Sequence, residues 1–160
     1  MKKIFFIGFF IALFMALWGC PPSPWAQMQP PPVSPPLLAT EEEVHQFLAT
    51  YGTRYAQRDI DGFLSLFSSN AVQNQKEKLE EIRRVYARFF NQSQELRFSL
   101  LERNIELYQN AVEVQGRYRI DQKLKKEETS RSVTGQIRWV LTREKGILKI
   151  LYLDFRNNAP

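Results

Sequence analysis

The stretch that decides the fold is Tyr55–Val72, YAQRDIDGFLSLFSSNAV. Arg58 and Asp59 interrupt the apolar pattern that precedes them, and Asp is one of the residues that cap the start of a helix. The next apolar residues recur at helical spacing on one face: Ile60, Phe63, Leu64 and Phe67. The stretch therefore predicts the end of one helix and a second, short helix that ends at 68–70.

The residues before this stretch predict a longer first helix. Thr40 and Glu43 have the spacing of a capping box, in which each side chain accepts a hydrogen bond from the other residue's backbone N–H. One helical stripe then carries the apolar and aromatic residues Val44, Phe47, Leu48, Tyr51 and Tyr55.

The residues after the stretch predict a third helix. Asn74, followed three residues later by Glu77, suits a capped start. The apolar positions again share one face, namely Leu79, Ile82, Tyr86, Phe89 and Phe90.

After Gln94 the apolar period changes from about 3.6 to 2, which is the period of β-strands. Four strands are predicted, over residues 96–107, 112–120, 133–141 and 147–155, with a tight hairpin at 144–146. The last strand is apolar on both faces, with Leu151 and Leu153 on one and Ile150 and Tyr152 on the other. It should lie centrally in the sheet or be covered by a partner subunit. The predicted class is α+β, with three N-terminal helices packed on an antiparallel sheet of about four strands.

This order of elements resembles the nuclear transport factor 2-like superfamily, which includes the SnoaL-like domains. The resemblance rests on Tyr55–Val72 and on the closing hairpin 135–155, GQIRWVLTREKGILKILYLDF. It implies a cone-shaped domain over residues 40–157, in which a strongly curved sheet wraps around the helices and leaves an apolar pocket open at one end. It also implies a homodimer through the sheet, as in many members.

The first twenty residues read as an export signal. Lys2 and Lys3 precede fifteen uncharged residues, 4–18, which is shorter than the roughly 20 residues of a membrane-spanning helix. The run Leu17-Trp18-Gly19-Cys20 resembles a bacterial lipobox and predicts a signal peptide over 1–19 and a lipidated Cys20. The alternatives are an uncleaved N-terminal anchor and ordinary cleavage near Ala26.

Residues 20–39 are predicted to form a linker behind that anchor. The segment 21–37 holds eight of the nine prolines, which favours an extended, semi-rigid spacer. The prediction is a lipoprotein that faces the periplasm, with the membrane as a partner through the lipid. Inner and outer membrane stay open.

Charge and composition exclude several classes of function. Without residues 1–19 the chain has 20 basic and 17 acidic residues, a net charge of +3, which is too small for a nucleic-acid-binding protein. One histidine and one cysteine do not make a zinc site. No phosphate-binding loop or nucleophile elbow is present, so no cofactor is expected.

The sequence offers few candidates for chemistry. The resemblance implies that Asn70 stands where relatives often carry Asp. This chain therefore lacks one possible catalytic carboxylate. Asp154 is the remaining candidate, and the alternative is that it lies in water at a strand end. His45, near Glu41, is interpreted as a solvated or capping residue. The aromatic residues that suit a ligand pocket, or else the core, are Tyr51, Tyr55, Tyr118, Trp139 and Tyr152.

Three hypotheses of function follow. The first is a tethered, non-catalytic binding module for a protein partner or a small apolar ligand. The second is a small-substrate isomerase, dehydratase or hydrolase that uses Asp154 with Tyr55 or Tyr152. The third is an accessory domain for an envelope protein, such as a cell-wall enzyme.

Overall fold

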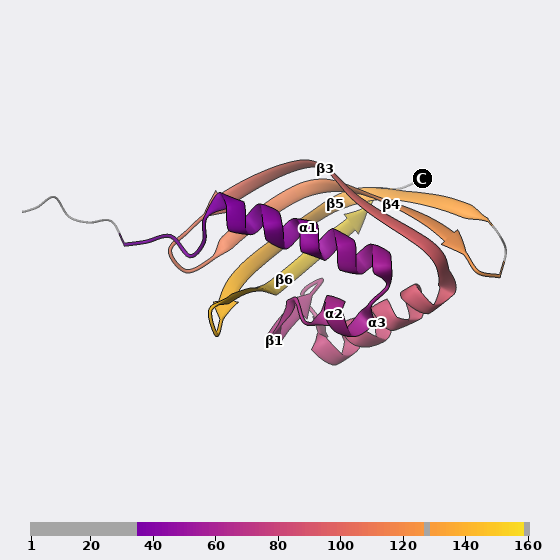
Figure 1. Cartoon of the computed structure of the whole chain (residues 1–160), viewed down its shortest axis with the longest axis horizontal. Helices are drawn as coiled ribbons and strands as arrows, with labels where there is room; N and C mark the ends of the chain where they lie inside the picture. Colours follow the sequence, from indigo (N-terminus) through magenta and orange to yellow (C-terminus); the bar gives the residue numbers. More distant parts are fainter. Residues whose placement is uncertain (1–34, 127–128, 159–160) are drawn as a thin grey trace, which may run out of the picture. The chain divides into compact units, whose positions relative to one another are not determined.

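The computed structural model describes residues 35–126 and 129–158 (Figure 1). In chain order the elements are α1 (Glu41–Gln57), α2 (Ile60–Leu64), β1 (Phe67–Gln73), β2 (Glu77–Lys78), α3 (Leu79–Gln92), β3 (Ser93–Leu107), β4 (Val112–Leu124), β5 (Ser130–Glu144) and β6 (Ile147–Asn157). The predicted α+β class is confirmed. Cys20 and the predicted signal peptide lie outside the described residues.

Helix α1 begins at the predicted capping box. The Thr40 hydroxyl accepts from the Glu43 N–H at 3.2 Å, and the Glu43 carboxylate accepts from the Thr40 N–H at 2.9 Å. Its five buried residues are those of the predicted stripe: Val44, Phe47, Leu48, Tyr51 and Tyr55. The helix ends at Arg58, which adopts a left-handed conformation with φ of 59°.

The region after α2 differs from the prediction. Asp59 caps α2 as expected and accepts from the Gly62 N–H at 3.0 Å. The helix stops at Leu64, however, and Phe67 begins strand β1 instead of continuing the helix. Phe67 pairs in parallel with Ile150 of β6, about 80 residues later in the chain. Local periodicity cannot reveal a pairing at that separation, which is why the prediction failed here.

Helix α3 begins later than predicted. Asn74 is not its cap but lies in a turn with φ of 48°, where its side-chain oxygen accepts from the Phe155 N–H at 3.1 Å. The helix starts after Lys78, whose N–H donates to the Glu81 carboxylate at 3.2 Å. The buried residues Ile82, Tyr86 and Phe90 belong to the predicted apolar face.

The sheet has six strands, not about four, in the order β2-β1-β6-β5-β4-β3. The four predicted strands are present, and the two additional ones are the short strands β1 and β2. Neighbouring strands are antiparallel except β1 and β6, which are parallel. In Figure 1 the four long strands bend along helix α1, which packs mainly on β3.

Strand β6 lies between β1 and β5, which confirms its predicted inner place in the sheet. The predicted division of its two faces is wrong, because β6 contains a bulge. Leu141 pairs with Ile150 and Val140 pairs with Tyr152, so Leu151 is an extra residue. An extra residue reverses the alternation of side chains beyond it. As a result Ile150 and Leu153 are both buried, whereas Tyr152 is 45% exposed.

The core between the helices and the concave side of the sheet is strongly aromatic. The Tyr51 ring lies 5.1 Å from the Phe63 ring and meets Trp139 edge-on, with centroids 5.5 Å apart and an interplanar angle of 83°. Such edge-to-face pairs contribute roughly 0.5–1.5 kcal/mol beyond the area they bury. Tyr51 therefore joins α1, α2 and β5 in one contact cluster.

Candidate functional site

A partly open cavity of about 270 Å³ lies beside this aromatic core and is lined by α1, α3 and the inner face of the sheet. Its wall is mostly aromatic and aliphatic: Tyr51, Tyr55, Val85, Tyr86, Phe89, Phe98, Tyr118, Ile120, Val133, Ile137 and Phe155. Three polar residues complete it, namely Gln122, Arg131 and Asn157. Ligand sites in proteins usually combine such an apolar wall with a few placed polar groups.

The tyrosines of the wall are held in their neutral form. Burial raises the pKa of Tyr51 and of Tyr55 well above the usual range, and raises the pKa of Tyr86 in the same direction. A phenol with a raised pKa is a poor proton acceptor near neutral pH. Within the described residues, no hydrogen bond joins the Tyr55 hydroxyl to a partner, so it is available to a ligand.

The polar residues lie on inner positions of three adjacent strands. Gln122 is 3% exposed, and its side-chain N–H₂ donates to the Ser93 hydroxyl at 2.6 Å. Arg131 pairs with Gln122 across β4 and β5. The Arg131 Nε donates to the side-chain amide oxygen of Gln122 at 2.5 Å. Tyr118 donates its hydroxyl to the side-chain oxygen of Asn157 at 2.5 Å.

The structure brings together some of the predicted pocket residues and separates others. Tyr51, Tyr55 and Tyr118 line the cavity. Trp139 is fully buried behind Tyr51 and is not one of the lining residues. Tyr152 lies on the outer face of the sheet, because the bulge at Leu151 turns it away from the core.

Asp154 also lies on the outer face, away from the cavity. It pairs with Arg138 across β5 and β6, and its carboxylate is 3.6 Å from the Arg138 guanidinium. Arg138 in turn donates two hydrogen bonds to Glu113, at 2.7 and 2.8 Å. The sequence placed Asp154 on the face of Ile150, and the bulge between them reverses this. The hypothesis of an Asp154–Tyr55 catalytic pair has no geometric support.

Sequence reasoning missed Gln122, Arg131 and Asn157, although a signal for them exists. Each continues the inward alternation of its strand: Tyr118, Ile120 and Gln122 in β4, Arg131, Val133 and Gly135 in β5, and Leu153, Phe155 and Asn157 in β6. A polar residue at an inward position on three neighbouring strands indicates a polar end of the cavity.

Other possible sites are weaker. His45 is 3.6 Å from Glu41, one turn away on α1, and does not line the cavity. Among the described residues, no group of three or more His, Cys, Asp or Glu side chains is placed to hold a metal ion. A wide, open hollow of about 900 Å³ on the outer face of the sheet is lined mainly by polar and charged residues, including Asp154 and Arg138.

The family model for the SnoaL-like domain matches residues 44–153. Comparison with curated proteins gives no sequence match. Similar solved structures include a nuclear transport factor 2-like superfamily protein from Salmonella enterica, with 14% identity and a TM-score of 0.65, covering 74% of this chain and 91% of that one.

Two further similar structures have names that suggest different roles. One, from Novosphingobium aromaticivorans, is provisionally named a scytalone dehydratase; it has 10% identity and a TM-score of 0.68, over 74% of this chain and 83% of that one. The other, from Xanthomonas campestris, is provisionally named a calcium/calmodulin dependent protein kinase II association domain; it has 14% identity and a TM-score of 0.66, over 75% of this chain and 89% of that one. At these identities the similarity concerns the fold alone.

Proposed function

This chain belongs to the SnoaL-like domain family, and we propose that it is a membrane-tethered, exported, non-catalytic module of the bacterial cell envelope that binds a small apolar ligand in its cavity. The observation that carries this proposal is the composition of the cavity wall. Among the described residues, the lining includes seven aromatic side chains and no carboxylate or imidazole. General acid–base catalysis near neutral pH is carried out most often by such groups.

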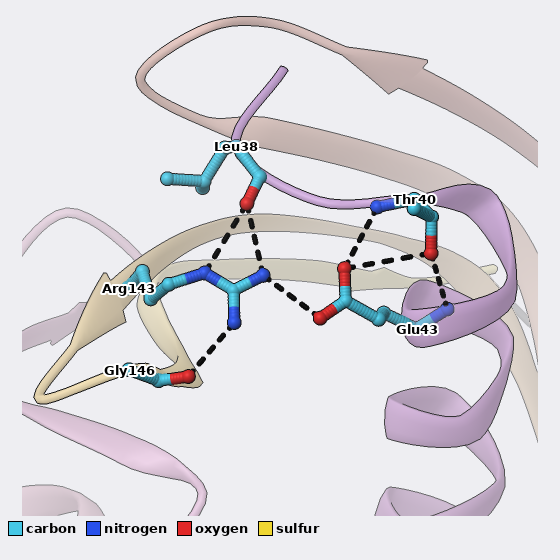
Figure 2. A network of polar contacts seen from close by, with 5 residues as sticks. All are labelled: Leu38, Thr40, Glu43, Arg143 and Gly146. Atoms are coloured by element: carbon cyan, nitrogen blue, oxygen red, sulfur yellow. Dashed lines mark hydrogen bonds and ion pairs between the residues drawn. The ribbon is translucent and has the colours of Figure 1, made fainter. Parts of the chain in front are cut away.

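The described segment that precedes α1 is held against the domain by hydrogen bonds. The Leu38 N–H donates to the Tyr108 carbonyl at 2.8 Å, in the turn between β3 and β4. Arg143, at the end of β5, donates to the Leu38 carbonyl and to Gly146 and Glu43 (Figure 2). The entering segment is thus fastened at one end of the long strands.

The polar end of the cavity lies at the opposite end of the same strands. Gln122 and Arg131 are close to the turn between β4 and β5, whereas Tyr108 precedes the start of β4. Leu38, which bonds to Tyr108, therefore lies at the end of the strands away from the polar end of the cavity. The anchor itself is supported by the pattern Met1–Cys20. Within residues 35–126 and 129–158, no helix combines the length and hydropathy needed to cross a membrane.

Mass spectrometry of the full chain purified from bacterial membranes tests both parts of the proposal. We expect a protein that begins at an acylated Cys20 and retains a small molecule under native conditions. The variant Cys20→Ser should lose the acyl groups, and its domain should stay folded. The variant Val133→Phe, which fills part of the cavity, should lose the retained molecule and keep the acyl groups. An uncleaved chain with an unmodified Cys20 would overturn the lipid anchor.

An enzyme is the second candidate, and the Tyr55 hydroxyl in the cavity, which has no hydrogen-bond partner among the described residues, favours it. The similar structure provisionally named a dehydratase gives a reaction class to assay first. Turnover of a small hydroxylated substrate that is abolished by Tyr55→Phe, with unchanged thermal stability, would replace the non-catalytic proposal. If Tyr55→Phe and the unaltered chain bind this substrate equally and neither turns it over, the non-catalytic proposal is supported.

A further inference from the structure

The polar end of the cavity has an unbalanced set of hydrogen-bonding groups. Both ends of the Gln122 amide are occupied, by Ser93 and by Arg131. The oxygen of the Asn157 amide is occupied by Tyr118. Within the described residues, no hydrogen bond or ion pair is found for the Asn157 amide nitrogen or for the two terminal nitrogens of Arg131. In the part of the chain that the structure describes, the unpaired groups at this end are therefore mainly donors, and one carries a full positive charge.

The position of the Arg131 guanidinium is set by the wall of the cavity. Its Nε is held by Gln122, which is itself fixed by Ser93, and the Ser93 hydroxyl donates to the Phe89 carbonyl at 2.7 Å. Arginine presents its N–H groups in a rigid, planar fork, so that fixing Nε also orients the two terminal nitrogens. Among the described residues, no carboxylate lines the cavity beside this charge.

We propose that the ligand is a small apolar carboxylate, with its hydrocarbon or aromatic part among the tyrosines and its carboxylate against Arg131. This inference rests on the proposed ligand-binding function and specifies its ligand class. A carboxylate accepts the planar fork of arginine in two parallel hydrogen bonds, which gives both affinity and orientation. The volume of about 270 Å³ is below the usual range of drug-sized sites, which restricts the ligand to about one ring with a short chain.

Isothermal titration of the full chain with three probes of one skeleton tests the proposal. The probes are 3-phenylpropanoate, 3-phenylpropan-1-ol and 3-phenylpropylamine, which carry a negative, a neutral and a positive end. We expect the acid to bind about tenfold more tightly than the alcohol, as for a charge-assisted hydrogen bond, and the amine to bind most weakly. The preference for the acid should fall at high salt, because the guanidinium is partly in water.

Two arginine variants separate Arg131 from a general effect of charge. Arg131→Gln should reduce the preference for the acid to about one, with little change in affinity for the alcohol. Arg103→Gln removes the same charge from an exposed position that does not line the cavity, and it should keep the preference. If Arg131→Gln kept the preference for the acid over the alcohol, Arg131 would not be the residue that binds the carboxylate.

The outcomes also separate this inference from the proposed function. Equal binding of the acid and the alcohol to the unaltered chain would overturn the carboxylate inference and leave the apolar binding site intact. Binding of none of the three probes, by a chain whose melting temperature is normal, would count against the binding function itself. Binding of all three that persists in Val133→Phe would place them outside the cavity.

Discussion

A single glycine controls the polar end of the cavity. Gly135 lies between Tyr118 and Asn157 in one row across β4, β5 and β6. A Cβ at this position would lie 2.7 Å from the Tyr118 ring and would also overlap the Arg156 carbonyl oxygen. The absent side chain therefore allows the Tyr118 ring to lie over Gly135 and its hydroxyl to reach Asn157.

Gly135→Ala is expected to destabilise the fold by about 1–3 kcal/mol, the usual cost of forcing extra atoms into a packed site. It should also weaken binding of the probe acid, because Tyr118 must move. Chemical denaturation and titration measure the two effects. Gly52→Ala is the matched control. Its Cβ would meet only Phe98, at 3.8 Å, so the higher helix propensity of Ala should stabilise α1 by up to about 1 kcal/mol.

At the scale of the elements, helix α1 is fastened at its start by more than its own cap. The Arg143 guanidinium donates to the Leu38 carbonyl at 2.9 and 3.2 Å, to Glu43 at 3.0 Å and to Gly146 at 2.8 Å. Two hydrogen bonds hold the pKa of the Glu43 carboxyl below its usual range. The one from the Thr40 backbone has the larger effect, and the one from Arg143 comes second. One side chain thus ties the entering segment, α1 and the β5–β6 hairpin together (Figure 2).

Arg143→Gln should destabilise the domain by about 1–3 kcal/mol, because it leaves the Leu38 carbonyl and the Glu43 carboxylate without this donor. Hydrogen exchange gives a local measure, since the Leu38 amide that bonds to Tyr108 should exchange faster. Arg84→Gln, in an exposed pair with Glu81 on α3, is the control and should change stability by less than about 0.5 kcal/mol. Equal losses in both variants would contradict the role given to Arg143.

The outer face of the sheet has its own cross-strand ion pair. Two hydrogen bonds from Arg138 hold the pKa of Glu113 below its usual range. A lowered folded-state pKa means that the pair stabilises the fold fully above the unfolded pKa of about 4.3, and less as the pH falls through the folded value.

Glu113→Gln should therefore cost about 1 kcal/mol or less at pH 7, since the Arg138 side chain is 42% exposed. The difference from the unaltered chain should shrink as the pH is lowered from 5 to 3. Urea titrations at several pH values measure it. Glu95→Gln removes a more exposed partner of Lys123, 3.7 Å away, and should show a smaller loss at pH 7. A loss that is independent of pH would show that packing, not charge, is responsible.

At the scale of the whole molecule, the described domain contains one continuous core. It runs from Ala39, before α1, to Leu153 in β6 and includes residues of every helix. Among the described residues, a hydrogen bond from Leu38 to Tyr108 ties the segment before α1 to the sheet. Residues 35–160 therefore contain the contacts that a folded domain needs.

A fragment of residues 35–160 is expected to unfold cooperatively, with a melting temperature within about 3 °C of the longer chain that starts at Cys20, a difference of under about 1 kcal/mol. Calorimetry measures both. A fragment that begins at Glu41 is the informative comparison, because it lacks Leu38 and the Thr40 cap and should melt lower. The same purified fragment can be examined by light scattering for the homodimer, which stays a prediction.

The residues that could be predicted from the sequence share a physical basis. The Thr40–Glu43 capping box, the Asp59 cap, the apolar stripe of α1 and the 144–146 hairpin all depend on groups within a few residues of each other. Their energies are local, so their patterns are visible in the chain. The resemblance in Tyr55–Val72 and 135–155 predicted the SnoaL-like family. The match of the family model over residues 44–153 confirms this prediction.

The tertiary structure alone decided which face of β6 carries Tyr152 and Asp154. Strand β1 forms because Phe67 pairs with Ile150. Asn74 does not cap α3, because its side-chain oxygen accepts a hydrogen bond from the Phe155 N–H. The extra residue Leu151 moves Tyr152 and Asp154 to the outer face, since one inserted residue reverses a period of two. The sequence by itself determined the class of fold and the aromatic content of the core. The bulge in the pairing of β5 with β6 placed Asp154 on the outer face, whereas Arg131 follows the inward alternation of its own strand.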